Sequence, residues 1–507
     1  MKPQNEEIEN FEQYIENIFS SGEMNMYKRS LQYSGRIWHF MLKDGREKFL
    51  ILMGHEKDLV ECGFHGTLID TQSRTYLKCQ CSHENAKVLR AKFKFTNPTI
   101  IGNVNSYGLG DRLGNAGPAH IKAIRNTDFK PVLAQQSIRE LERTRRTGED
   151  VIDAASWAVF QEGYTDGFGA DADHLKTKDD IDRMVKAGFT MFTIDPSDYV
   201  VNEALTMGKD DLIDSYNGLP WEDLNSDPGE RLSHFGKPVR LHSGFSLNPA
   251  KEDVMRGMVK YGNVIVHTKK MVRYLLKTYP EHPAEFELSV DETDQPTTLF
   301  EHYLIAAELC RLGVAVVSLA PRFCGDFEKG IDYRGDLNTF RKEYEMHLAI
   351  AESFGGYKLS IHSGSDKFSV YEVIGELKSG SVHVKTAGTS YLEALRTIAE
   401  VDPDLFRDIL KFSLKRFNED KKTYHISANP VQITDPDSVS GRRLPAFLDD
   451  NHARQVLHVA YGSVLTEAGA EKRGFKKRLM KSLSEYEEIY EKNLREHFIK
   501  HIKPFDL

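Results

Sequence analysis

The sequence predicts an elaborated (β/α)8 barrel of the TIM type with a small N-terminal α+β appendage. Three observations predict this fold. Short apolar runs alternate with helical stretches from about residue 104, eight such runs are present, and the first hundred residues show a hairpin pattern instead. Alternating strands and helices imply parallel strands joined by right-handed crossovers. We therefore expect an appendage over residues 1–100 and a barrel over residues 101–507.

The appendage is predicted to be a helix followed by a small antiparallel sheet. The stretch RIWHFMLKDGREKFLILMG has apolar residues on both sides of a Lys-Asp-Gly-Arg turn, which is typical of a hairpin. Strand-like runs follow at TYLKCQC and KVLRAKFKF. The pair Cys79 and Cys81 resembles half of a soft-metal site, but no second cysteine pair accompanies it.

Eight short apolar runs are the predicted barrel strands. A doubly wound open sheet is the rival architecture, and it commonly has a Gly-rich phosphate turn after its first strand. The first predicted strand ends in QQSIREL, which has no glycine, so the barrel is favoured. The predicted strands cover residues 131–137, 169–176, 189–195, 286–292, 314–322, 357–363, 382–388 and 455–462.

Three connecting segments stand out. Long insertions follow the third and seventh strands, at about residues 196–285 and 425–445, and each could be a functional lid, an oligomer contact or inert decoration. The Gly-rich segment 106–118, SYGLGDRLGNAGP, lacks the Lys-Ser/Thr ending of a phosphate loop. We expect it to plug the barrel floor or to lead into the first helix.

Composition limits the class of partner. The 507 residues include 67 basic and 76 acidic side chains, a formal net charge of −9, so nucleic acid and anionic membranes are disfavoured. The acidic N-terminus does not look like a signal peptide, no apolar run is long enough to cross a bilayer, and five cysteines do not suggest a disulfide framework. We expect a cytoplasmic protein that binds a small polar molecule, with a homo-oligomer left open.

Strand periodicity predicts which side chains face the barrel interior. Barrel enzymes carry their sites at the C-terminal ends of the strands, and side chains alternate along each strand. Apolar Phe286, Leu288 and Val290 should face the helices, so their neighbours should face inward. Either Asp173 or His174 could point in. The other inward polar residues predicted in this way are Thr193, Asp195, Glu287, Ser289, Asp291, Ser360, His362, His383, Lys385 and His458.

Several imidazoles and carboxylates are thereby predicted at one rim. A single buried histidine is more often structural than a ligand, but several on one face favour a metal site. Imidazole with carboxylate suits Zn, Mn, Ni, Fe or Co, and the residue types do not choose among them. We expect a divalent metal held by His174, His362 and His383, with His458 in reserve.

Two cations are predicted at the same rim. Lys385 and Arg322 could bind an anionic substrate, or they could form structural ion pairs with Asp195 or Asp291.

Several long blocks resemble one enzyme family. SYGLGDRLG, PVLAQQSIREL, ASWAVFQEGYTDGFGADADHLKT, FTIDPSD, ELSVDETDQPTT, SLAPRF, YKLSIHSGSDKFSVY, HVKTAGTSYLEALR and RQVLHVAYGSVL resemble the bacterial tagaturonate epimerase family, from about residue 100 onward. The resemblance implies a barrel enzyme that depends on a divalent metal and interconverts D-tagaturonate and D-fructuronate during hexuronate breakdown. It also implies that Ser137, Glu140, Thr193 and His362 belong to the site.

The implied reaction limits the mechanism. The two ketoacids differ at C3, counted from the carboxylate, whereas the ketone is at C5, so deprotonation at C3 would give an unstabilised carbanion. Retro-aldol cleavage of the C3–C4 bond and re-addition to the other face avoids this, with acid and base drawn from Glu140, Glu287 and Asp291. Transient oxidation would need a nicotinamide, and no G-x-G-x-x-G follows a strand.

Other functions remain open at this point. A metal-dependent aldolase or ketose isomerase could use the same rim. A non-catalytic sugar-acid-binding barrel is a further alternative, although such a protein needs no cluster of histidines.

Overall fold

A computed structural model gives the fold. It describes residues 11, 13–15, 24–70, 75–241, 244–466 and 474–505. The helix predicted near the N-terminus lies largely outside these residues, although positions 11 and 13–15 are helical. None of the helices in the described part of the chain combines the length and apolarity that a membrane span requires.

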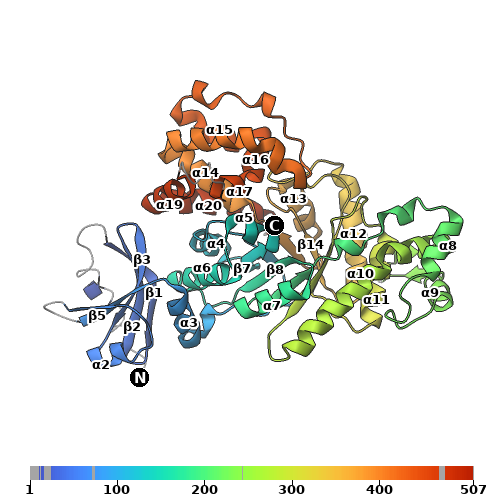
Figure 1. Ribbon diagram of the computed structural model, residues 1–507, viewed down its shortest axis with the longest axis horizontal. Helices are drawn as coiled ribbons and strands as arrows, with labels where there is room; N and C mark the ends of the chain where they lie inside the picture. The colour runs from blue at the N-terminus through green and yellow to red at the C-terminus, as the bar shows by residue number, and fades with distance from the viewer. Residues whose placement is uncertain are drawn as a thin grey trace.

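The N-terminal region is a separate five-stranded antiparallel sheet, drawn in blue in Figure 1. Its strands occur in the order β1-β2-β3-β5-β4. They are β1 (Met24–Ser34), β2 (Ile37–Asp44), β3 (Glu47–Met53), β4 (Thr67–Asp70) and β5 (Thr75–Gln80), with the short helix α2 (Glu56–Val60) between β3 and β4.

The predicted hairpin is present, but the run KVLRAKFKF is not a strand. It falls mostly in helix α3 (His83–Lys92), which begins at Ser82, whose side chain accepts a hydrogen bond from the amide of Asn85. From residue 89 to residue 95 apolar and basic residues alternate as in a strand, but the capped helix and its packing against the sheet override this local pattern. Buried residues of α3 pack with the sheet and with Trp157 of the barrel, which joins the two regions.

A closed barrel of eight parallel strands forms the centre of the molecule (Figure 1), as the sequence predicts. Its strands are β6 (Ser106–Gly108), β7 (Lys130–Ser137), β8 (Gly169–Leu175), β9 (Met191–Ile194), β12 (Glu285–Val290), β13 (Ser318–Pro321), β14 (Lys358–Ile361) and β15 (Val382–Lys385). Strand β6 pairs with both β7 and β15 and so closes the barrel.

The prediction of the eighth strand was wrong. Residues 455–462 belong to helices α16 (Asn451–Val459) and α17 (Tyr461–Thr466), and the missing strand is β6, inside the segment 106–118 expected to be a plug or a leader. The run QVLHVAYG is buried on every side, so it shows no amphipathic period, and a short apolar run of this kind cannot be assigned by pattern. Strand β6 has three residues, too few to show an alternation.

Helices surround the barrel. At least one of them follows each strand except β9, which leads into the long insertion, and β7 is followed by two. They are α4 (Gly117–Ile124), α5 (Ile138–Thr144), α6 (Gly148–Gln161), α7 (Lys178–Ala187), α11 (Leu299–Arg311), α12 (Leu337–Ser353), α13 (Phe368–Leu377) and α14 (Thr389–Val401).

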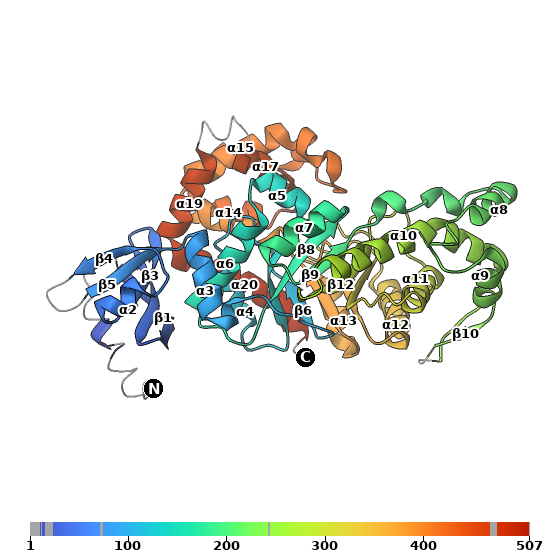
Figure 2. The same cartoon turned by 60° about the horizontal axis from the view of Figure 1, so that its bottom comes forward.

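The long insertion after β9 forms an arm that extends away from the barrel, in green in Figures 1 and 2. Its backbone is the 28-residue helix α10 (Lys251–Thr278), which returns the chain to the barrel. The arm also contains α8 (Lys209–Asn217), α9 (Pro228–Phe235), β10 (Val239–Arg240) and β11 (Ser246–Leu247).

The C-terminal helices form a layer over one side of the barrel (Figure 2). The predicted insertion at 425–445 consists of short 3-10 turns in front of α16. The remaining helices are α15 (Pro403–Asp420), α19 (Phe475–Glu485) and α20 (Glu487–Ile502), and α20 packs against α4, α13 and α14.

Candidate active site

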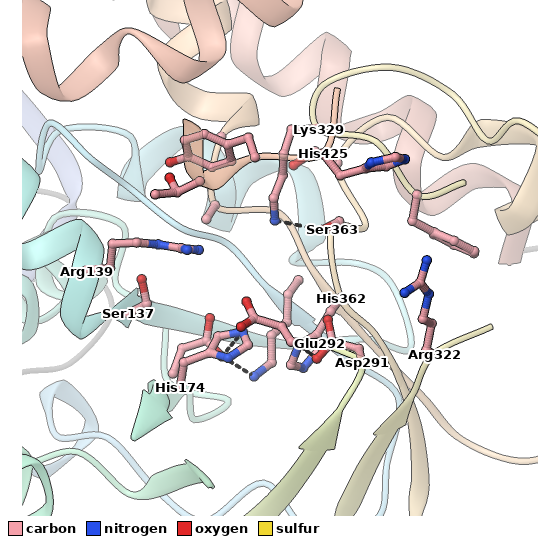
Figure 3. Close-up of a pocket in the computed structure, with 18 of the residues that line it drawn as sticks. Ser137, Arg139, His174, Asp291, Glu292, Arg322, Lys329, His362, Ser363 and His425 are labelled. Carbon is pink, nitrogen blue, oxygen red and sulfur yellow. Dashed lines mark hydrogen bonds and ion pairs between the residues drawn. The ribbon is translucent and has the colours of Figure 1, made fainter. Parts of the chain in front are cut away.

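A cavity of about 360 Å³ opens at the C-terminal ends of the barrel strands, where barrel enzymes carry their sites. Figure 3 shows its side chains converging from strand ends, from loops and from helix α5. The charged and polar residues that line it include Arg112, Gln135, Ser137, Arg139, Glu140, Asp173, His174, Asp291, Glu292, Arg322, Lys329, His362, Ser363, Lys385, Tyr424, His425 and His458.

A backbone irregularity at the end of β8 decides whether Asp173 or His174 faces the cavity, which strand periodicity left open. The pairing of β8 with β9 shifts register between Ala172 and Leu175, and His174 has a φ of 55°. Because a residue in this region departs from the extended strand, alternation is interrupted, and both Asp173 and His174 line the cavity.

His174 is oriented by a carboxylate behind it. Its Nδ1 lies 3.1 Å from Asp195 Oδ2, and its Nε2 lies 3.8 Å from Asp173 Oδ1. Although burial disfavours a charged ring, Asp173 and the hydrogen bond to Asp195 raise the pKa of His174 to about 9. A carboxylate that holds one ring nitrogen and leaves the other facing the site is the arrangement found behind metal-binding histidines.

His362 directly follows β14 and has the same arrangement. Its Nε2 lies 2.7 Å from Glu287 Oε1, and its Nδ1 lies 3.2 Å from Asp291 Oδ1. Nδ1 is buried, and its contact with Asp291 is an ion pair that lacks hydrogen-bond geometry. Burial opposes protonation, but Asp291 raises the pKa of His362 to about 10.

Lys385 is neutralised beneath these histidines. Its Nζ lies 2.8 Å from Asp171 Oδ2, 2.7 Å from Asp173 Oδ1 and 2.7 Å from Glu287 Oε1. It also donates to Thr193 Oγ1 at 2.8 Å. Burial lowers the pKa of Lys385, but the carboxylates outweigh it and raise the pKa well above the ordinary value. Lys385 therefore forms structural ion pairs, but with Asp171, Asp173 and Glu287 rather than with Asp195 or Asp291.

The residues at the base of the cavity suit a cation. Ligand atoms of Asp173, His174 and His362 lie within 4.8 Å of one another. Five carboxylates, counting that of Asp173, lie in or beside this group, together with the ammonium of Lys385 and the imidazoles of His174 and His362, and buried charges need compensation. His362 Nδ1 lies 3.2 Å from Asp291 Oδ1 without hydrogen-bond geometry, so a cation between them could take both atoms as ligands. The five carboxylates belong to Asp171, Asp173, Asp195, Glu287 and Asp291.

Glu140 lies on the opposite wall in a buried ion pair. Arg112 Nε and Nη2 lie 2.9 and 2.8 Å from Glu140 Oε1, and Gln136 Nε2 donates to Oε2 at 3.1 Å. Ser137 caps the helix α5 that carries Glu140, because its hydroxyl accepts from the Glu140 amide at 3.2 Å.

The structure brings most of the predicted site residues together. Those that line the cavity are Ser137, Glu140, His174, Asp291, Arg322, His362 and Lys385, with His458. His458 comes from α16 rather than from a strand. Thr193, Asp195 and Glu287 lie beneath the surface of the cavity, where they contact Lys385, His174 and His362.

His383 does not join the other two predicted ligands. It lies deeper in the barrel, its Nδ1 is 2.9 Å from Ser106 Oγ, and it is not among the residues that line the cavity. Burial lowers its pKa to about 3, which keeps the ring neutral. Strand parity predicts an inward direction but not the depth along the strand, and His383 is the second of four residues in β15.

Strand periodicity missed three lining residues. Arg139 lies on α5 and Lys329 on the loop after β13, whereas Glu292 was included in the predicted strand 286–292 on its outward face but lies on the loop after β12, which ends at Val290. Their positions depend on how helices and loops fold back over the barrel, so periodicity could not find them. The positive φ values of Gly325 and Gly330, 76° and 72°, mark the turns of the Lys329 loop, and these glycines were the signal available.

The barrel and its cluster of histidines and carboxylates define an enzyme that acts on a small polar substrate. Residues 27–505 match the family model described as tagaturonate epimerase. The chain belongs to the tagaturonate epimerase family, whose members are isomerases.

Named relatives agree with the family. The chain is 40% identical over 477 residues to a tagaturonate/fructuronate epimerase of Thermotoga maritima, and the match covers 94% of this chain and 96% of the relative. It is 39% identical to the crystallised native fructuronate-tagaturonate epimerase of Cohnella laeviribosi, with a TM-score of 0.87 and coverage of 97% and 99%. The form of that enzyme complexed with two glycerols gives a TM-score of 0.88, 39% identity and coverage of 98% and 99%.

Proposed function

We propose that this chain interconverts D-tagaturonate and D-fructuronate at C3 with the help of a divalent metal ion. The named relatives supply the substrates, and they match nearly the whole chain. The observation that carries the metal dependence is the pair of inward imidazole nitrogens, His174 Nε2 and His362 Nδ1, each of which faces a carboxylate.

Asp173, His174 and His362 would hold the metal, with Asp291 beside them. This set of nitrogen and oxygen donors suits Zn, Mn, Ni, Fe or Co. A bound divalent ion would act as a Lewis acid that stabilises negative charge on a substrate oxygen. Asp195 and Glu287 would orient the two histidines from behind.

Retro-aldol chemistry inverts C3 without removing its hydrogen. A carboxylate takes the proton of the C3 hydroxyl, the C3–C4 bond breaks, and its electron pair moves into the enediolate formed by C4, C5 and the ketone oxygen. The C3 aldehyde then turns, C4 attacks its other face, and the new C3 alkoxide receives a proton.

Asp291 lines the cavity directly after β12, and Glu140 lines it from helix α5 after β7; two other strands separate β12 from β7 within the barrel. One of them takes the proton in each direction, and the other, protonated from water, returns it. Glu287 is buried beneath these two residues, where it forms ion pairs with Lys385 and His362.

Product analysis tests the reaction. The purified enzyme, given tagaturonate and metal, should form fructuronate, and in deuterated water C3 should keep its own hydrogen. Accumulation of three-carbon fragments would identify an aldolase, and deuterium at C3 would overturn the retro-aldol route.

Chelation tests the metal. Dialysis against a chelator should abolish epimerisation, and adding back one of the candidate ions should restore it. Full activity after dialysis, with no metal detected by elemental analysis, would overturn the metal dependence, whereas binding without turnover in every condition would indicate a sugar-acid-binding barrel.

The proposal also concerns location and organisation. It places the enzyme in the cytoplasm, where its five free cysteines would stay reduced. It further divides the chain at about residue 100 into a sheet-bearing appendage and a catalytic barrel with its arm.

A further inference from the structure

The cavity has cations that carboxylates neutralise and cations that they do not. Lys385 contacts three carboxylates and Arg112 pairs with Glu140. Among the described residues, no carboxylate lies within 4.0 Å of the charged groups of the other cations that line the cavity. These are Arg139, Arg322 and Lys329.

In Figure 3, Arg139 and Lys329 point into the same part of the cavity, above His174 and His362. Arg322 enters from the opposite side. The side chain of Arg322 also donates to the backbone carbonyl of Thr293, which ties it to the loop after β12. The cavity is therefore divided into a base rich in carboxylates and a part with two cations that have no carboxylate in direct contact, although Glu292 and Glu140 act on Arg139 from farther away.

Lys329 is held in place by buried cations beneath its loop. Lys367 Nζ donates to the carbonyls of Glu328 and Ile331 at 2.7 and 2.5 Å, and Arg454 Nε donates to the carbonyl of Gly330 at 2.8 Å. The neighbours of Lys329 on both sides are thus fixed. Lys329 Nζ itself donates to Ser363 Oγ at 2.6 Å, so the clamped loop and this hydrogen bond position the ammonium and lower the entropic cost of binding an anion.

Arg139 is held on the other wall. It projects from α5, two residues after the helix cap Ser137, and its guanidinium lies 5.6 Å from the centre of the Tyr424 ring. The guanidinium lies over this ring, and Figure 3 shows the side chain of Arg139 pointing into the cavity. A planar guanidinium of this kind can bind a carboxylate through two parallel hydrogen bonds.

We propose that Arg139 and Lys329 bind the carboxylate of the hexuronate and so determine both the orientation and the acid specificity of the substrate. This inference rests on the proposed function. The carboxylate cannot bind at Lys385, where three carboxylates already lie and would repel it. With its carboxylate between Arg139 and Lys329, the substrate directs its hydroxyl and ketone oxygens to the cluster at the base.

Paired ligands test the assignment. The first measurement is conversion of tagaturonate by the wild-type enzyme, which decides the proposed function independently. Binding is then compared for tagaturonate and for its uncharged counterpart, in which a hydroxymethyl group replaces the carboxylate. Arg139→Gln and Lys329→Met should each raise KM for tagaturonate about ten- to a hundredfold, as expected for the loss of one charge-assisted hydrogen bond.

The inhibition constant of the uncharged counterpart should change less than threefold in both variants, because it lacks the group that these cations bind. Arg139→Lys and Lys329→Arg keep the charge and should recover part of the loss. Lys176→Met is the matched control: it removes a charge after β8 that is paired with Asp198 and lies outside the cavity lining, so KM should not change.

Two results would overturn the assignment while the epimerase proposal stands. One is an unchanged KM for tagaturonate in both Arg139→Gln and Lys329→Met, with a large rise in Arg322→Gln. The other is an equal loss of affinity for the charged and the uncharged ligand, which would mean that the two residues only shape the cavity.

Discussion

Two buried clusters of histidine and carboxylate in this barrel have the same kinds of residue and different properties. In each, three ligand atoms lie within 4.8 Å of one another. The first lies at the base of the cavity and the second lies behind it, between the loop after β14 and helix α20. They consist of Asp173, His174 and His362, and of Asp366, His497 and His501.

The polar groups of the second cluster are hydrogen-bonded to one another and to their neighbours. Asp366 accepts from His497 Nε2 at 2.5 Å and from Arg454 Nη2 at 2.6 Å. His501 Nε2 accepts from the Asp366 amide at 3.1 Å, and its Nδ1 lies 3.1 Å from the His497 carbonyl. Both ring nitrogens of His501 therefore have hydrogen-bond partners, and a metal ion would have to displace these hydrogen bonds.

In the first cluster, neither the hydrogen bonds nor the charges are fully balanced by neighbouring groups. His362 Nδ1 lies 3.2 Å from Asp291 Oδ1 without hydrogen-bond geometry, and the five carboxylates outnumber the ammonium of Lys385 and the two imidazoles. The comparison teaches that proximity of histidine and carboxylate does not define a metal site. What distinguishes the first cluster is its excess of buried carboxylates and a ring nitrogen without a hydrogen bond.

Replacing one histidine from each cluster should give the largest contrast. We expect His362→Ala to lose bound metal and to reduce kcat about a thousandfold or more, because a donor and the Lewis acid are lost together. His497→Ala should keep its metal while losing about 3 kcal/mol of stability, because Asp366 loses a buried partner. Elemental analysis, kcat and urea unfolding measure these effects, and the opposite pattern of metal content would reverse the comparison.

The carboxylate beside His362 should affect catalysis. Asp291→Asn removes a proton acceptor from the cavity and should lower kcat by about a hundredfold to ten-thousandfold. Asp326→Asn, an exposed carboxylate on the same cavity, is the control and should change kcat less than threefold. Equal effects of the two substitutions would show that Asp291 acts only through the overall charge of the cavity.

Lys385 tests the charge balance of the first cluster. Lys385→Met leaves three buried carboxylates without their common cation and should destabilise the metal-free protein by about 3–5 kcal/mol. Lys176→Met, on the surface, should change stability by about 0.5 kcal/mol or less. Urea unfolding with a chelator present measures both, and a stable Lys385→Met protein would mean that the carboxylates protonate at little cost.

The pH dependence of stability should reveal His501 of the second cluster. Burial lowers the pKa of His501 to about 3 from an ordinary value of 6.5, so the folded protein keeps this ring neutral. Below pH 6.5 the unfolded chain takes up a proton that the folded chain does not, and stability falls as the pH drops toward 3. His501→Gln removes this pH-dependent contribution to the free energy of unfolding.

We therefore expect the stability gap between wild type and His501→Gln to narrow by about 1.4 kcal/mol for each pH unit below 6.5. Urea unfolding at pH 7.5 and pH 5 gives the comparison. A gap that is the same at both values would show that His501 is protonated in the folded state.

Periodicity was enough to predict seven of the eight strands and the inward direction of Glu287, Asp291, His362 and Lys385. Side chains alternate along a strand whatever surrounds it, so the inference needs only local sequence. It was not enough for β6, which is too short to alternate, or for His174, where the backbone leaves the strand geometry.

The sequence by itself determined the barrel class, the rim on which the polar strand ends meet, and the family resemblance that the comparisons confirm. Only the tertiary structure decided that Lys385 is neutralised, that His383 lies below the cavity, and that Arg139 and Lys329 enter it from a helix and a loop. The physical reason is that alternation is a local property of the chain. Ion pairing and depth instead depend on distances between segments far apart in sequence.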